Sequence, residues 1–274
     1  MHILKIFFLT LFFISFAFCL VPSKQLDIFD RYHLDKVNIS VLYLLRNDTQ
    51  ALNEIVTKDD FDVFSESQII LGDEKFTGKK YSFFRALLKE KRYDITDKIF
   101  AKLPKSKLQD NTLQYAMYES IRNDMESYRY LLLKGILPLY KNEFGDTTLT
   151  ELAQFGTLED FKNAISLGAT VDTTNPYFIQ NALYGKKYDT VRFLLDNYPF
   201  DLNTPPKDNR YFPTFLFYLV SIDSTNGQNK EFFHYLLGKF NDATIQKYGD
   251  EFVKRLEKKE SKFLEDVLKK FGAI

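Results

Sequence analysis

The segment from Gly145 to Asp172 constrains the fold more than any other part of the chain, because it has the pattern of two short helices separated by a glycine. Thr147 can cap the first helix by accepting a hydrogen bond from a first-turn amide. The apolar positions of that helix are Leu149, Leu152 and Ala153. Gly156 permits a tight turn, and Gly168 stands where a left-handed cap ends a helix. The apolar positions of the second helix are Phe161, Ala164 and Ile165.

The same pattern recurs on both sides of this segment. Its downstream copy, offset by thirty residues, contains Ile179, Ala182, Leu183, Asp189, Val191, Leu194 and Leu195. Its upstream copy, with about three residues inserted between the helices, contains Thr112, Leu113, Ala116, Met117, Tyr128, Leu131, Leu132 and Gly135. A weaker copy contains Phe84, Leu87, Leu88, Asp94, Ile99 and Phe100, and residues 41–56 and 215–237 keep only the rhythm of helix pairs. The repetition predicts an all-α solenoid of stacked helix-turn-helix units with short hairpin loops.

The segment Gly145-Asp146-Thr147-Thr148-Leu149, together with Gly156 and the closing Gly168-Ala169, resembles the ankyrin repeat. The family has Pro at the position of Thr148 and His at the position of Thr150. The resemblance implies a repeat solenoid over residues 40–274, clearest at 110–203, that binds other proteins through hairpin tips and the exposed side of each first helix. Another helix-pair solenoid or an irregular helical bundle is the alternative architecture.

The N-terminus has the features of a secretory signal peptide covering residues 1–19. Lys5 precedes an apolar run from Ile6 to Phe18, which is short for a membrane span but typical of a signal sequence. Ala17 and Cys19 supply small residues before a cleavage site at Leu20. An uncleaved anchor and a lipoprotein are alternatives, and the bulky Phe18 before Cys19 argues against the lipoprotein. Residues 20–39 are then a linker or a first helix, and the protein is expected to be exported to a periplasm or secreted.

Composition and motifs argue against several kinds of site. Lys plus Arg and Asp plus Glu both number 37, so the neutral chain offers no field for nucleic acid. Cys19 is the only cysteine, and the three histidines have no partners at metal-ligand spacing, so neither a metal nor another cofactor is expected. The best candidate cation site, Asp59-Asp60-x-Asp62 with Glu66, lacks the glycine and terminal glutamate of an EF-hand and favours a solvated loop.

These observations predict a monomeric, non-enzymatic module that binds another protein and has no membrane contact beyond the signal peptide. Aromatic and polar side chains near the expected loops and first helices are the candidate contacts. They are Tyr140, Asn142, Phe144, Asp146, Thr150, Gln154, Tyr177, Gln180, Tyr184, Arg210 and Tyr211. Alternative hypotheses are a periplasmic immunity or protector protein for a toxin or enzyme, a hydrolase using Asp59 and Asp62, and a structural spacer.

Overall fold

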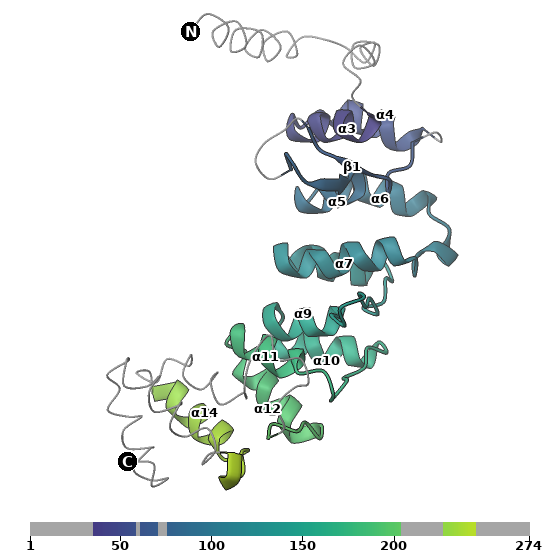
Figure 1. The fold of residues 1–274 in the computed structure, drawn as a ribbon. Helices are drawn as coiled ribbons and strands as arrows, with labels where there is room; N and C mark the ends of the chain where they lie inside the picture. Colours follow the sequence, from purple (N-terminus) through teal and green to yellow (C-terminus); the bar gives the residue numbers. More distant parts are fainter. Residues whose placement is uncertain (1–34, 59–60, 71–75, 204–226, 245–274) are drawn as a thin grey trace, which may run out of the picture. The chain divides into compact units, whose positions relative to one another are not determined.

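The computed structural model describes residues 35–58, 61–70, 76–203 and 227–244 (Figure 1). It is mostly helical, which confirms the predicted predominance of helix. The chain divides into two compact units, Met1–Leu108 and Gln109–Ile274. The predicted signal peptide, residues 1–19, lies outside the described residues, as do Asp59, Asp60 and the two candidate contacts Arg210 and Tyr211.

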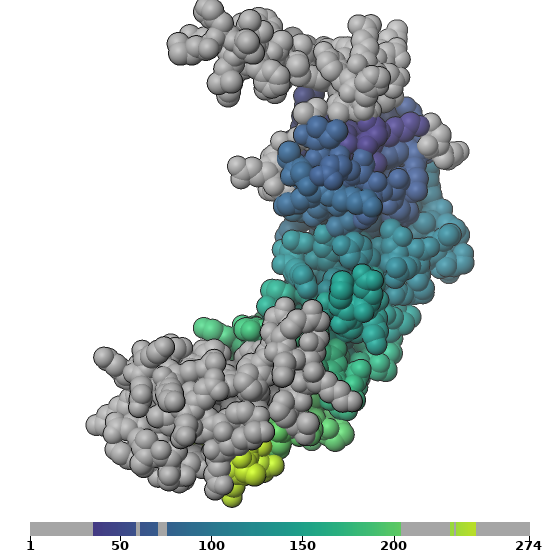
Figure 2. Space-filling model, in the orientation of Figure 1, coloured from purple at the N-terminus to yellow at the C-terminus, as the bar shows by residue number. Residues whose placement is uncertain are grey.

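The described part of unit 1 contains two helix pairs and a short antiparallel sheet. Its elements are α3 (Lys36–Leu45), α4 (Thr49–Thr57), β1 (Glu66–Gln68), β2 (Lys80–Ser82), α5 (Phe83–Lys89), α6 (Tyr93–Lys102) and the 3₁₀ turn η3 (Lys105–Lys107). The first helices α3 and α5 pack on each other, as do the second helices α4 and α6. Side chains fill the space between these ribbons (Figure 2). The pair expected over residues 41–56 is therefore present, and its first helix begins earlier than expected, at Lys36.

The turns inside both pairs of unit 1 have the same geometry. Asn47 and Lys91 adopt a left-handed φ of 56° and 54°. Arg92 then joins the second turn to the first, because its Nη1 donates to Asn47 Oδ1 at 2.8 Å and its Nη2 donates to Thr49 Oγ1 at 3.1 Å. Asp94 holds the same guanidinium at 2.9 Å, so one arginine fixes two consecutive turns.

Among the described residues of unit 2 there are three helix pairs and a further helix. Its elements are α7 (Asn111–Asn123), α8 (Met125–Leu133), α9 (Thr148–Phe155), α10 (Leu158–Ser166), α11 (Tyr177–Tyr184), α12 (Tyr188–Asn197) and α14 (Gly227–Leu237). The first helices pack in series, α7 on α9 and α9 on α11, and α10 packs on α12 (Figure 1). Most of the apolar positions predicted for α9 to α12 are buried, whereas Ile165 and Leu195 are half-buried. The buried positions are Leu149, Leu152, Ala153, Phe161, Ala164, Ile179, Ala182, Leu183, Val191 and Leu194.

The helix ends of α9 and α10 follow the predicted chemistry. Thr147 Oγ1 accepts from Thr150 N at 3.0 Å, and Thr150 Oγ1 accepts from Thr147 N at 2.8 Å, which completes a capping box. Gly168 has the left-handed φ of 102° that its position predicts. The prediction that about three extra residues separate α7 from α8 is wrong. These residues belong to α7, which is longer than expected, and only Asp124 separates the two helices. The Asp124 side chain caps α8.

Candidate functional site

A closed hairpin loop joins α8 to α9 and contains four of the predicted contact residues. Its stem is held by Thr148 N donating to Tyr140 O at 3.0 Å and by Asn142 N donating to Asp146 O at 2.9 Å. The Asn142 side chain organises the tip, because Oδ1 accepts from the amides of Phe144 and Asp146 and Nδ2 donates to Asp146 Oδ2. With three bonds from one side chain, the tip has little freedom to rearrange.

The next loop, between α10 and α11, is tied to this hairpin by one asparagine. Asn175 Nδ2 donates to Gly145 O at 3.0 Å, and Asn175 Oδ1 accepts from Tyr177 N at 2.9 Å. Asp172 Oδ1 accepts from the side chain and amide of Thr174 within the same loop. We call residues 140–148 and 172–177 together the hairpin edge. It is a continuous, hydrogen-bonded rim of unit 2.

The aromatic residues of the hairpin edge have opposite roles. Tyr140 packs its ring against Tyr118 and Tyr115, with centroids 4.9 Å and 5.4 Å away, so it anchors the loop to α7. Phe144 is 75% exposed and contributes nothing comparable to the core. Tyr177, at the start of α11, is half-buried. Of the loop aromatics predicted to contact a partner, Tyr140 therefore packs against the core and Phe144 projects into solvent.

Two residues expected on the exposed side of the first helices are buried, so that expectation is wrong for them. Thr150 is fully buried because its hydroxyl completes the capping box of α9. Gln180 is 7% exposed because α11 is covered by α9 on one side and by α12 on another. Gln154 is half-buried, and Tyr184 is 59% exposed at the end of α11.

Beside the hairpin edge, a buried carboxylate pairs with a half-exposed arginine, which was not predicted from the sequence. The Glu151 carboxylate, 2% exposed, accepts from Arg122 Nε at 2.5 Å and Nη2 at 2.6 Å. Tyr118 Oη lies 3.3 Å from the same carboxylate, and burial together with the negative charge of Glu151 raises the pKa of Tyr118 far above its usual value. Tyr118 and Glu151 are one repeat period apart, and this spacing was the only feature of the sequence that could have indicated their contact.

A similar link joins the second helices. Arg129 holds Asp160 in a two-pronged pair, with Nε to Oδ1 at 3.0 Å and Nη2 to Oδ2 at 2.8 Å. Asp160 also belongs to the capping box of α10, because Oδ2 accepts from the amide and hydroxyl of Thr157. Burial alone would raise the pKa of Asp160, but these hydrogen bonds outweigh it and lower the pKa to about 2. The carboxylate is therefore structural.

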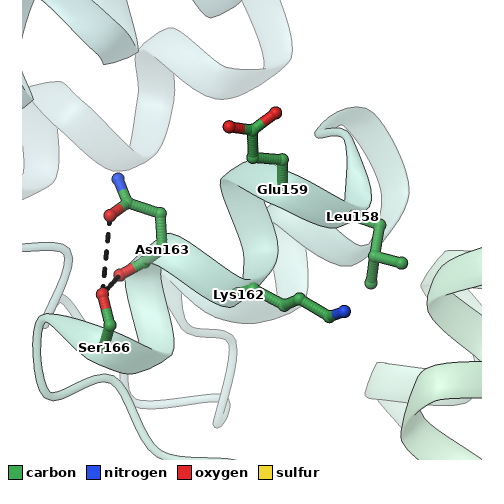
Figure 3. A pocket seen from close by; sticks show the side chains of 5 residues that line it. All are labelled: Leu158, Glu159, Lys162, Asn163 and Ser166. Atoms are coloured by element: carbon green, nitrogen blue, oxygen red, sulfur yellow. Dashed lines mark hydrogen bonds between the residues drawn. The ribbon is translucent and has the colours of Figure 1, made fainter.

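Two open hollows occur on unit 2 away from the hairpin edge. One, of about 640 Å³, lies among the turns before α10 and α12 and the start of α14. The other, of about 620 Å³, follows α10 past Leu158, Glu159, Lys162, Asn163 and Ser166 (Figure 3). In Figure 3 Glu159 and Lys162 point away from each other, and Ser166 Oγ donates to the backbone oxygen of Asn163 at 2.7 Å. The groups that line this hollow do not converge on a common point, as acid–base chemistry would require.

The candidate cation ligands and the histidine serve other purposes in the described part of the chain. Asp62 accepts from the amide of Phe64 in a turn, and Glu66 pairs with Arg85 at 2.5 Å. His234 is exposed on α14. Within the described ranges no group of three or more histidine, cysteine or acidic side chains is placed to hold a metal ion. None of the helices described there is both long and apolar enough to span a bilayer.

Comparison with models of known protein families and with curated proteins finds no match to this chain. The geometry of the site is therefore the basis for assigning a function.

Proposed function

We propose that the chain is a non-enzymatic protein-binding module, a solenoid of divergent ankyrin-like helix pairs that contacts its partner along the hairpin edge and the exposed ends of the first helices. The observation that carries the proposal is the exposed Phe144 on a hairpin whose tip is fixed by Asn142. A large aromatic side chain held rigidly in a polar loop is the usual anchor of a protein interface, because little conformational entropy is lost when it binds.

The repeat architecture is supported by hydrogen bonds that join residues about one predicted period apart. They connect Tyr118 to Glu151, Arg129 to Asp160, Gly145 to Asn175 and Thr150 to Asn181. Each link runs between consecutive helix pairs, and together they span the first helices, the second helices and the loops. Contacts of this kind stack one pair on the next and leave the loops along one rim.

The proposal includes export of the chain before it meets its partner. Its support is the signal-peptide pattern of residues 1–19, and it is tested by measuring the mass of the protein recovered from the extracytoplasmic fraction of its source. A mass that begins at Leu20 is the expected result. A full-length chain in the cytoplasm would contradict export without touching the binding function.

The binding function is tested by capture with the chain from Leu20 to Ile274 as bait in extracts of its source. The test variant carries Phe144→Ser and Tyr184→Ala, two exposed positions whose loss leaves the core intact. Leu133→Ala is the matched control, because Leu133 is 87% exposed on α8 and lies outside the hairpin edge. Circular dichroism confirms that all three proteins are folded.

A protein captured by the wild type and the control but lost with the test variant, and then bound as a purified protein in calorimetry, is the expected result. Capture of no protein, or equal capture by all three baits, would overturn the proposal. If a partner is found, its gene position distinguishes an immunity or protector role from other uses, because an immunity gene lies beside its toxin.

A further inference from the structure

The tip of the first loop presents Phe144 in a fixed position. Its amide donates to Asn142 Oδ1 at 3.0 Å, so the backbone at this residue is bonded inward while the ring is 75% exposed. Gly145 follows with a left-handed φ of 89°, a conformation that glycine adopts without strain. Asn175 then ties Gly145 O to the next loop. The backbone that carries the exposed ring is fixed by the hydrogen bonding of both loops.

The charged side chains of the hairpin edge are mostly negative. The two loops of the hairpin edge contain one basic residue, Lys141, and three acidic residues, Glu143, Asp146 and Asp172, which gives a net charge of −2. The whole chain has no net charge, so this excess is local. Hydrogen bonds from Thr174 lower the pKa of Asp172, which keeps that carboxylate ionised over a wide pH range.

We propose that the hairpin edge docks a basic segment of a partner protein, which encloses Phe144 in apolar side chains and places Lys or Arg beside Glu143, Asp146 and Asp172. This proposal rests on the proposed protein-binding function and adds the chemistry of the partner. The aromatic ring supplies the anchor that the partner buries, and the carboxylates of the same edge supply the charged groups that select the partner and speed association.

The test selects peptides from a library of random dodecapeptides on the immobilised chain from Leu20 to Ile274. We expect the selected sequences to be enriched in Lys or Arg next to large apolar residues. A synthetic peptide of the consensus is then titrated by fluorescence polarisation at two salt concentrations. Its affinity should fall as salt rises, because exposed opposite charges are screened.

The variants separate the two contributions. Phe144→Ala should weaken the consensus peptide about tenfold or more, the size expected of a central aromatic anchor. Glu143→Gln, at the exposed neighbouring position, should weaken it about threefold and flatten the salt dependence. Leu133→Ala, outside the edge, should bind as the wild type does.

Three results would overturn the proposal: no enriched peptide, a neutral or acidic consensus, or unchanged affinity in Phe144→Ala. A second copy of the chain as the occupant would appear as a dimer in sedimentation that Phe144→Ala abolishes, and it would overturn the proposal as well. If a partner protein is captured from extracts but binds through a different surface, the protein-binding function is supported and the inference about the hairpin edge is wrong. Capture of no protein at all would overturn the binding function itself.

Discussion

Two neighbouring helix pairs of unit 2 are stabilised in different ways. The pair α9 and α10 begins each helix with a capping box, from Thr147 and from Thr157. In the pair α11 and α12, Asn175 Oδ1 accepts from Tyr177 N at the start of α11, whereas α12 has no side-chain cap at Lys187. Both helices of the first pair are therefore fixed by their own capping boxes, whereas α12 of the second pair lacks that local support.

The second pair depends on its neighbour instead. Asn181 Nδ2 donates to Thr150 O at 3.1 Å, and Asn175 ties the preceding loop to Gly145. The end of α11 also approaches α9 so closely that a Cβ on Gly185 would lie 2.0 Å from Gln154 O. A helix pair with one uncapped helix is thus stabilised by packing on a pair in which both helices are capped, which is the expected behaviour of stacked units.

The largest loss of stability is expected from a substitution at the close contact between α11 and α9. Gly185→Ala should destabilise unit 2 by about 3 kcal/mol, because the new methyl group meets a backbone oxygen that cannot rotate away. Hydrogen exchange should show α11 and α12 losing protection before α9 and α10. Urea unfolding followed by circular dichroism gives the size of the loss.

Gly168→Ala is the matched control for that substitution. Gly168 has a left-handed φ of 102°, but its added methyl group would meet only Leu139 Cδ2 at 3.8 Å. Its cost should be about 1–2 kcal/mol from backbone strain alone. Equal losses for the two variants would contradict the role given to the close approach of α11 to α9.

The pair α9 and α10 is also stabilised by its neighbour α7, through the ion pair between Arg122 and Glu151. Arg122→Ala measures the contribution of this ion pair to stability. The substitution leaves the Glu151 carboxylate buried with only Tyr118 beside it. The free energy of unfolding should fall by about 2–3 kcal/mol, less than for a fully buried pair because Arg122 is half-exposed. Arg122→Lys should recover part of the loss. A change below about 0.5 kcal/mol would mean that solvent already screens this pair.

The sequence predicted the features that depend on local chemistry. The helix pairs, the cap at Thr147, the left-handed Gly168 and the buried stripes follow from residue type and spacing. The burial of Thr150 and Gln180 could not be predicted in this way, because a polar residue at those positions is normally exposed, and tertiary packing overrides that tendency.

The turns inside the pairs were missed for a similar reason. Asn47, Lys91 and Lys186 all adopt a left-handed φ, which lysine rarely does. The same two backbone bonds recur around each of them, such as Lys186 N to Leu183 O and the following amide to Ala182 O. Because the turn is fixed by hydrogen bonds to the backbone of the preceding helix, the residue types in the turn do not predict its left-handed conformation.

The cap of α10 provides a pH test of local stabilisation. Because the pKa of Asp160 falls to about 2 on folding, the carboxylate stabilises the folded chain fully above the unfolded pKa of about 4. That contribution, about 1–2 kcal/mol after screening at the half-exposed Arg129, is lost as the pH falls from about 4 to 2. Urea midpoints from neutral to acid pH should therefore show a smaller fall in this range for Asp160→Asn than for the wild type. Identical pH profiles would contradict the assignment.

The smallest expected effect is a gain, obtained by giving α12 the cap that it lacks. The turn before α12 has the geometry of the turn before α4, with φ and ψ of −88° and 66° at Lys187 and −77° and 81° at Asp48. Asp48 caps α4 by accepting from Ala51 N at 3.0 Å. Lys187→Asp should accept from Thr190 N in the same way and stabilise unit 2 by about 0.5–1 kcal/mol. Lys187→Ala separates the cap from the loss of a positive charge at the helix start, and an equal gain in both variants would show that the missing cap does not limit α12.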